Sequence, residues 1–276
     1  WNMSQNVLVV HGGGPTAVIN ASLYGVIEEA KRNPEVGKVY GAIGGTGAIF
    51  SETFIDLTSF DDEKLKLLLH TPASAIGSSR YPLYEKDYEK MVDIFKKHDI
   101  KYVLLNGGNG TMDACGHIYE VCKDQDIKVV GIPKTIDNDI AMTDHSPGYG
   151  SAARFIAAST QEVGEDVKSL PIHVCIMEAM GRNAGWITAA SALARRKQGD
   201  APHLIYLPER NFNEDEFLED VSKLQKKQGG VVVLVSEGLH DANGESIVPP
   251  IFKSERAVYY GDVSSHLANL VVKKLG

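Results

Sequence analysis

Short apolar runs alternate with longer segments of helical periodicity along most of the chain. The strand candidates are residues 6–10, 39–43, 102–105, 128–132, 173–177, 203–207 and 231–235. The helix candidates between them are residues 17–32, 85–98, 112–123, 151–167, 186–196 and 213–227. This order is typical of βαβ units around a parallel sheet, and near-continuous apolar strands such as 231–235 favour a sheet covered on both faces. The sequence therefore predicts an α/β fold in which parallel sheets lie between layers of helices.

Composition and charge limit the classes of function. The 276 residues, 43% of them apolar, are enough for one large or two small domains with a core. The net charge of −8 argues against a nucleic-acid surface, so particular Arg and Lys residues must bind any anionic substrate. The three cysteines have neither metal spacing nor a disulfide framework, and no apolar run reaches the roughly 18 residues of a membrane span. We expect a cytoplasmic protein with no nucleic-acid or membrane partner.

The most informative stretch is residues 131–139, Gly-Ile-Pro-Lys-Thr-Ile-Asp-Asn-Asp. It follows a strand candidate, and ligands of parallel α/β sheets bind at the carboxyl ends of strands. In an extended loop, Asp137 and Asp139 would face different ways, so that one can act as a base while the other meets a cation. The alternative is an acidic turn held by Asx hydrogen bonds.

Two glycine-rich loops lie between a strand candidate and a helix candidate. Residues 11–16 read His-Gly-Gly-Gly-Pro-Thr, and residues 106–111 read Asn-Gly-Gly-Asn-Gly-Thr. Glycines let backbone N–H groups approach a phosphate, and a helix N-terminus adds a favourable dipole. In the second loop, Asn109 offers an amide oxygen and Gly110 leaves space beside it. Either loop could be only a tight turn, but the two together predict phosphate binding.

Three further motifs carry charged side chains. Residues 77–82, Gly-Ser-Ser-Arg-Tyr-Pro, hold Arg80 in a turn, where its planar fork could contact a transferring phosphoryl group. Met-Gly-Arg at 180–182 and Ser-Glu-Gly at 236–238 follow two more strand candidates. Arg182 could bind an anion, and Glu237 could accept hydrogen bonds from sugar hydroxyls. Each motif is common without function, whereas their repetition at one edge of a sheet is less common.

Taken together, these motifs resemble the phosphofructokinase family. The resemblance is carried, in the family's order, by residues 13–20, 107–111, 133–139, 180–182 and 236–238. It implies Mg²⁺-dependent phosphoryl transfer from ATP or pyrophosphate to the 1-hydroxyl of fructose 6-phosphate. It also implies two similar lobes with the site between them: a donor-binding lobe of residues 1–140 and a sugar-phosphate lobe of residues 141–276. Family members are usually homodimers or homotetramers, and we expect the same here.

The resemblance also assigns roles to single residues. Asp137 would be the base that takes the proton of the sugar hydroxyl, Thr135 would position the reacting groups, and Arg80 would stabilise charge in the transition state. The donor-binding residues would be Gly14, Arg80, Gly108, Asn109, Gly110, Thr111 and Lys134. The sugar-phosphate residues would be Thr135, Asp137, Met180, Gly181, Arg182 and Glu237. Asn109 and Asp139 would lie at the magnesium ion.

The chain departs from the family pattern at several positions. Asn109 replaces the usual Asp, which removes one negative charge from the metal site. His173 stands where many members carry an Arg that reaches the neighbouring subunit's site. Members also continue past the equivalent of Gly276 with further sugar-phosphate contacts, so we expect the sugar-phosphate lobe to be truncated at its C-terminus.

The phosphoryl donor is a separate question. Members that use pyrophosphate typically have Asp at the Gly110 position and Lys at the Lys134 position, whereas members that use ATP typically have Gly at the first and commonly at the second. The Pro-Lys-Thr and Gly-Gly-Pro-Thr segments recur in pyrophosphate-using members. The space at Gly110 nevertheless admits ATP, and we expect ATP as donor, with pyrophosphate as the alternative.

Two other classes of protein share part of the pattern. NAD and diacylglycerol kinases have a Gly-Gly-Asp-Gly-type loop, but the full set of motifs argues against them. A non-catalytic regulatory subunit of the phosphofructokinase type is the second alternative, favoured by Asn109 and opposed by Asp137.

Overall fold

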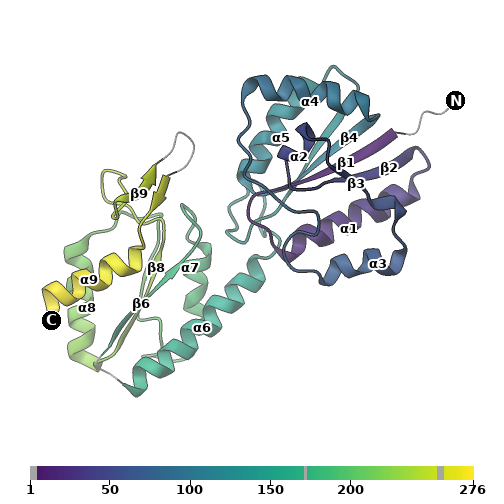
Figure 1. Cartoon of the computed structure of the whole chain (residues 1–276). Coiled ribbons are helices and arrows are strands. Elements are labelled where there is room, and N and C mark those ends of the chain that lie inside the picture. The colour runs from purple at the N-terminus through teal and green to yellow at the C-terminus, as the bar shows by residue number, and fades with distance from the viewer. Residues whose placement is uncertain (1–4, 171–172, 254–257) are drawn as a thin grey trace. The chain divides into compact units, whose positions relative to one another are not determined.

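The computed structural model describes residues 5–170, 173–253 and 258–276. By its internal contacts the chain divides into two compact units, Trp1–Thr135 and Ile136–Gly276. Each unit holds a parallel or mostly parallel sheet with helices packed against it (Figure 1). The predicted α/β class is confirmed.

The sheet of the first unit brings three strand ends to one edge. Its order is β3-β2-β1-β4-β5, and only β3 runs antiparallel to its neighbour. The strands are β1 Gln5–Gly12, β2 Val36–Ala42, β3 Phe54–Asp56, β4 Ile100–Gly107 and β5 Lys128–Pro133. Register pairs Gly12 with Gly107, and Gly107 with Pro133. The last residues of β1, β4 and β5 are therefore direct neighbours.

Helices cover both faces of this sheet (Figure 1). They are α1 Ala17–Arg32, α2 Gly47–Phe50, α3 Asp62–Lys66, α4 Glu85–Lys97 and α5 Asn109–Cys122. Side chains of β1 alternate between the faces: Leu8 and Val10 pack with α4 and α5, while Val7 and Val9 pack with α1. The unit is thus a three-layer sandwich with two apolar cores.

The second unit repeats this architecture on a smaller sheet. The strands β6 Val174–Ala179, β7 Leu204–Tyr206 and β8 Val231–Ser236 are parallel, in the order β6-β8-β7. Along β8, Val231, Val233 and Val235 pack against α8 and α9, whereas Val232 and Leu234 pack against α6 and α7. These helices are α6 Tyr149–Ser169, α7 Trp186–Ala190, α8 Glu214–Gln228 and α9 Val263–Leu275. An antiparallel pair, β9 Pro250–Lys253 and β10 Val258–Tyr260, completes the described part of the unit.

Every strand and helix candidate has a counterpart in the structure, although the predicted helix 186–196 is α7 followed by a 3₁₀ turn at Ser191–Ala194. The sequence reading missed β3, β9, β10, α2 and α3, each of which is five residues or shorter, and also α9. Short elements give too few periods to recognise. Within the described residues, no helix is both long and apolar enough to cross a membrane.

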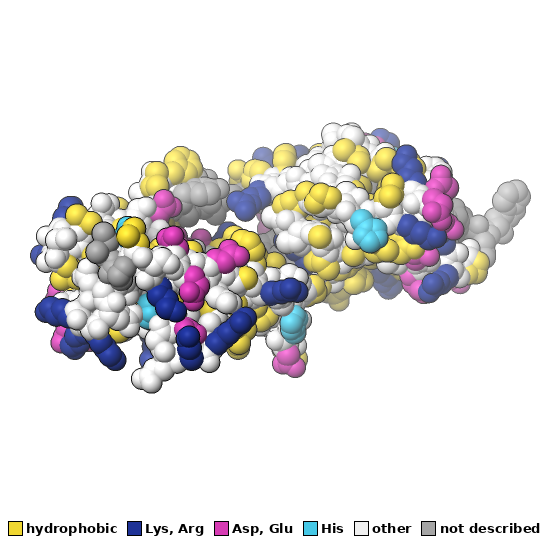
Figure 2. Space-filling model, turned by 90° about the horizontal axis from the view of Figure 1, so that it is seen from below, with side chains coloured by type: hydrophobic (Ala, Val, Ile, Leu, Met, Phe, Trp, Pro, Cys, Tyr) yellow, Lys and Arg dark blue, Asp and Glu magenta, His cyan; other side chains and the backbone are white. Residues whose placement is uncertain are grey.

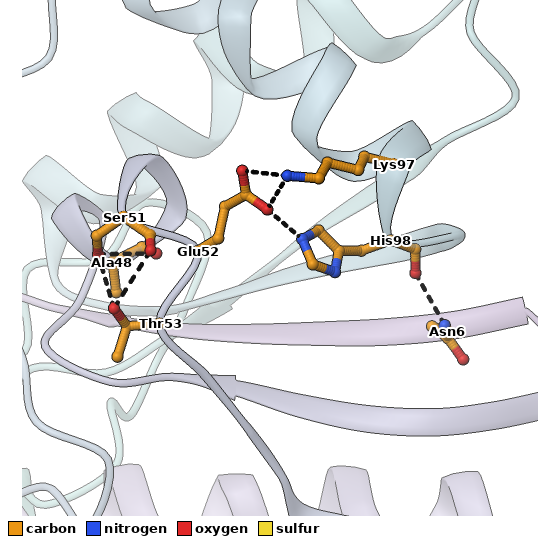
Figure 3. A network of polar contacts seen from close by, with 7 residues as sticks. All are labelled: Asn6, Ala48, Ser51, Glu52, Thr53, Lys97 and His98. Atoms are coloured by element: carbon orange, nitrogen blue, oxygen red, sulfur yellow. Dashed lines mark hydrogen bonds and ion pairs between the residues drawn. The ribbon is translucent and has the colours of Figure 1, made fainter.

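A polar network joins the end of α4 to the turn before β3 (Figure 3). The carboxylate of Glu52 accepts hydrogen bonds from Lys97 Nζ at 2.7 Å and pairs with His98 Nε2 at 2.6 Å. The backbone carbonyl of His98 accepts a hydrogen bond from Asn6 Nδ2 of β1 at 2.8 Å. This network fixes α4 over the sheet, away from the carboxyl ends of the strands.

Candidate active site

The three neighbouring strand ends bring the two glycine loops and Lys134 together. The Lys134 backbone N–H donates to the Gly107 carbonyl at 2.9 Å, and its ammonium group donates to the carbonyl oxygen of Gly14. The lysine side chain is buried, with only 6% of the residue exposed. A positive charge therefore lies between the loop after β1 and the end of β4, where an anion could approach the exposed Gly14.

The loop after β4 combines a packed residue with two exposed ones. A side chain on Gly107 would overlap Thr111, with its Cβ 2.7 Å from Thr111 Cβ and 2.5 Å from the Gly12 carbonyl oxygen. Thr111 thus fills space that Gly12 and Gly107 leave open, and it supports the loop from within. Asn109 and Gly110 are exposed in the first turn of α5, and a Cβ added to Gly110 would meet no atom within 4 Å.

Arg80 follows a segment that is tied to the first glycine loop. Gly13 N–H donates to the Ser79 carbonyl at 3.0 Å, and Ser78 Oγ donates to the Gly13 carbonyl at 2.7 Å. Ser79 also forms an isolated parallel bridge with Gly12. The structure thus brings the backbone before Arg80 next to the loop of Gly14, with the arginine side chain exposed.

The loop with the two aspartates is held by the residue between them. Asn138 has a left-handed backbone with φ 57°, which asparagine tolerates better than most residues. Its Oδ1 accepts a hydrogen bond from Ser146 N–H at 2.7 Å, and the residue is buried. Thr135 is also buried, whereas Asp137 is half-buried and Asp139 is exposed. The Asn138 hydrogen bond spans eight residues, so it ties the whole loop together and differs from the short-range bond of an Asx turn.

In the second unit, Glu237 holds the Met-Gly-Arg loop. Its Oε1 accepts hydrogen bonds from the backbone N–H groups of Gly181 at 2.9 Å and Arg182 at 3.0 Å. Gly181 has φ 138°, a conformation that favours glycine, and a Cβ there would overlap the Ala184 carbonyl. Met180 and Arg182 are exposed next to this anchor. The structure therefore joins the predicted sugar-phosphate residues 180–182 and Glu237 at the ends of β6 and β8.

The sequence analysis did not identify the buried polar residues behind the two glycine loops. His11 and Asn106, register partners on β1 and β4, are both fully buried. Burial lowers the pKa of His11 to about 4. Asn20 of α1 is fully buried as well, and it hydrogen-bonds to the segment before Arg80. Each of these three residues could have been recognised in the sequence as a polar residue at a position where the strand or helix pattern predicts an apolar one.

Both predicted metal-binding positions carry side-chain oxygen atoms. Mg²⁺ binds oxygen, and in phosphate-transfer sites it is usually held by one or two carboxylates together with substrate phosphates and water. Asn109 in the first unit and Asp139 in the second are both exposed, and each by itself carries an oxygen of the type that such a cation binds. No cluster of three or more His, Cys, Asp or Glu side chains in the described ranges forms a metal site by itself. His173 contacts the Leu170 carbonyl through Nδ1 at 2.9 Å and is exposed.

Surface charge is mixed on the face seen in Figure 2, where Lys and Arg side chains are interspersed with Asp and Glu. The positive charge of the buried Lys134 is therefore not part of a larger positive surface on this face. The protein as a whole has a net charge of −8.

Comparison with known proteins relates these features to one family. The family model described as phosphofructokinase matches residues 6–275. A pyrophosphate–fructose 6-phosphate 1-phosphotransferase of Rhodospirillum rubrum is 42% identical over 272 residues, covering 96% of this chain and 67% of that protein. The protein of the same name from Halomonas elongata is 40% identical over 251 residues, covering 87% of this chain and 60% of that protein.

Solved structures give the same result. The crystal structure of a pyrophosphate-dependent phosphofructokinase from Marinobacter aquaeolei superposes with a TM-score of 0.83 at 38% identity. The match covers 99% of this chain and 66% of that one. The chain thus spans about two thirds of the length of the relatives it matches.

Proposed function

Because the chain belongs to the phosphofructokinase family, we propose that it transfers a phosphoryl group from pyrophosphate to the 1-hydroxyl of fructose 6-phosphate. The observation that carries the proposal is the buried ammonium of Lys134 at the Gly14 carbonyl, between two glycine loops. Lys at this position is the feature that the resemblance associates with pyrophosphate. The two relatives at 40% and 42% identity are also named for this donor, which outweighs the expectation of ATP from Gly110 alone.

The first unit, in this proposal, binds the donor. The backbone N–H groups around Gly14 and Gly108 face the phosphates, as at other helix N-termini that follow glycine loops. Lys134 adds a positive charge whose burial strengthens its attraction for phosphate. Arg80 contacts the transferring group, where a planar guanidinium can make two hydrogen bonds at once. Thr111 acts from beneath the loop by fixing its backbone.

The second unit binds the sugar phosphate. Arg182 attracts its anionic group, and Met180 and Gly181 line the site beside it. Since Glu237 Oε1 already accepts two backbone hydrogen bonds, this residue orients the 180–182 loop in addition to any contact with a sugar hydroxyl.

The chemistry consists of positioning and charge stabilisation, since phosphoryl transfer leaves little covalent work to a protein. Asp137 accepts the proton of the 1-hydroxyl as that oxygen bonds to phosphorus, and the bond from phosphorus to the leaving phosphate breaks. Thr135 positions the reacting groups, and Arg80 offsets the charge that develops on the phosphoryl oxygens. Mg²⁺, held by Asn109 and Asp139, would neutralise donor charge when bound. The products are fructose 1,6-bisphosphate and inorganic phosphate.

ATP is the second candidate donor. It is favoured by one observation, the open space around Gly110, where a Cβ would meet no atom within 4 Å. A donor with groups beyond its second phosphate needs such space.

Oligomeric state and location stay predictions. The family resemblance favours a homodimer or homotetramer, and the sequence favours the cytoplasm.

The test is formation of fructose 1,6-bisphosphate from fructose 6-phosphate and Mg²⁺ in the purified protein, with pyrophosphate or ATP supplied in parallel. We expect turnover with pyrophosphate, and we expect Asp137→Asn to lower kcat on the order of 10²–10⁴-fold, because the base is removed. Asp144→Asn is the matched control, an exposed aspartate in the same loop. It should keep wild-type kcat.

Three results would contradict parts of this proposal. Turnover with ATP alone would make the space at Gly110 decisive for the donor. A wild-type kcat in Asp137→Asn would show that Asp137 is not the base. No turnover with either donor would favour the non-catalytic regulatory subunit.

A further inference from the structure

His11 occupies a position where β1 should carry an apolar side chain. It follows Val7 and Val9 at a spacing of two, and those valines pack in the core beneath α1. The imidazole is fully buried, and its Nε2 has no hydrogen-bond partner among the described residues. A buried polar atom without a partner costs stability, so a histidine here requires an explanation beyond packing.

The explanation lies in its contact with Ser74. His11 Nδ1 lies 2.8 Å from Ser74 Oγ, and Ser74 Oγ donates its own proton to the Gly77 carbonyl at 2.8 Å. Ser74 therefore accepts from His11, which places the imidazole proton on Nδ1. The result is a directed chain of two hydrogen bonds from the core of the sheet to the backbone three residues before Arg80.

The residues from 71 to 80 form no helix or strand that would fix their path by itself. Asn20 holds the start of this segment: its Nδ2 donates to the Thr71 carbonyl at 2.7 Å, and Ala75 N–H donates to its Oδ1 at 2.8 Å. Gly13 holds the end through its N–H bond to the Ser79 carbonyl at 3.0 Å. His11 holds the middle, between these two anchors.

We propose that His11, acting through Ser74, is a positioning residue for Arg80 and so for the pyrophosphate site. This proposal rests on the proposed function, in which Arg80 contacts the phosphoryl donor, pyrophosphate. Loss of the Nδ1 donor removes the side-chain hydrogen bond from the sheet to Ser74, although the Gly44 N–H bond to the Ile76 carbonyl at 2.8 Å and the buried Ile76 side chain still hold part of the turn. The 71–80 segment then samples more conformations, and Arg80 loses the orientation in which it meets phosphate.

The experiment compares His11→Leu, which removes the donor, with His11→Asn, whose Nδ2 can take the place of Nδ1. Ser74→Ala keeps His11 in the core and removes both the acceptor for Nδ1 and the donor to the Gly77 carbonyl, and it remains informative if His11→Leu fails to fold. Ser59→Ala is the matched control, because Ser59 Oγ donates to the Asp56 carbonyl at 2.7 Å in the same unit, outside the 71–80 segment.

Two readouts are measured on each protein. The first is hydrogen exchange of the backbone amides in residues 71–80, which needs no turnover. We expect faster exchange on the order of tenfold in His11→Leu, which loses one hydrogen bond, and at least as large an increase in Ser74→Ala, which loses two. His11→Asn and Ser59→Ala should exchange at the wild-type rate.

The second readout is the Kd of magnesium pyrophosphate by calorimetry, with and without Arg80→Ala. His11→Leu should weaken binding on the order of tenfold when Arg80 is present, and by less than about twofold in the Arg80→Ala protein, because both changes remove the same contact.

Either of two results overturns the proposal. One is additive losses of affinity from His11→Leu and Arg80→Ala, which would mean a general structural effect. The other is an equal defect in His11→Asn and His11→Leu. Absence of turnover in the wild-type protein is a separate result that removes the proposed function, since the exchange and binding data do not depend on turnover.

Discussion

The imidazole of His11 links a single residue to the acid stability of the fold. Burial lowers its pKa from 6.5 to about 4, so the folded protein holds it neutral where the unfolded chain would protonate it. The stabilisation is complete above the unfolded pKa and is lost as the pH falls from about 6.5 toward about 4. The residue that we propose as a positioning residue for Arg80 therefore also makes the first unit sensitive to acid.

We predict that His11→Asn, which cannot titrate in this range, loses less stability in acid than the wild-type protein. The shift in pKa corresponds to roughly 3 kcal/mol of unfolding free energy between neutral pH and about pH 4. Urea unfolding of both proteins at about pH 7 and about pH 4.5, followed by circular dichroism, measures the difference. Equal losses of unfolding free energy in the two proteins would show that the pKa of His11 is the same in the folded and unfolded states.

Other residues at this scale have a double use. Glu237 was predicted from its place at a strand end, but its bonds to the Gly181 and Arg182 N–H groups appear only when β6 and β8 are neighbours. In the sequence, Asn138 is only one residue of the 131–139 motif, but in the structure its side chain fixes the loop between two aspartates.

At the scale of elements, the junction of β1, β4 and α5 explains which glycines the donor loop requires. Gly107 lies in β4 with Thr111 and the Gly12 carbonyl pressed against it. Gly110 lies one turn away in α5, where a side chain would meet no atom within 4 Å. The sequence singled out Gly110 for the space beside it, whereas the packing at Gly107 is visible only in the structure.

We predict opposite effects from two equal substitutions. Gly107→Ala should destabilise the protein by about 1–3 kcal/mol or more, because the new Cβ overlaps backbone that cannot move aside. Gly110→Ala should be neutral or stabilising by up to about 1 kcal/mol, since alanine is the better helix former. Thermal unfolding of the two variants beside the wild type measures this, and a similar loss in both would show that the α5 turn is packed on its outer face.

At the scale of the whole molecule, the two units carry different halves of the proposed site. Gly14, Arg80, Gly108–Thr111 and Lys134 belong to the first unit, whereas Met180–Arg182 and Glu237 belong to the second. Asp137 follows the boundary after Thr135 by two residues. In the proposed function, the donor-binding residues therefore all lie in the first unit, whereas the sugar-phosphate residues lie in the second unit except for Thr135, the last residue of the first.

We predict that changes in each unit affect one substrate only. Lys134→Met should raise the KM for pyrophosphate on the order of tenfold and leave the KM for fructose 6-phosphate within about twofold, because one charged contact is lost. Arg182→Ala should do the reverse. Initial rates with each substrate varied in turn provide the measurement, and a rise in both KM values from either variant would contradict the assignment of one substrate to each unit.

The sequence by itself determined the layered α/β fold and the loops that matter. Periodicity located the principal strands and helices, and α1 was predicted with its observed bounds, Ala17–Arg32. Glycine and polar residues after the strands indicated the two glycine loops. Such a loop depends on the few residues that form it, so a short stretch of sequence is enough to recognise it.

Only the tertiary structure decided which distant residues meet. The ammonium of Lys134 reaches the Gly14 carbonyl across 120 positions of sequence, and His11 reaches Ser74 across 63. Both contacts exist because β1, β4 and β5 are neighbours in the sheet and α1 covers one face. The order of strands depends on how whole elements bury their apolar faces together, and no single stretch of sequence contains that information.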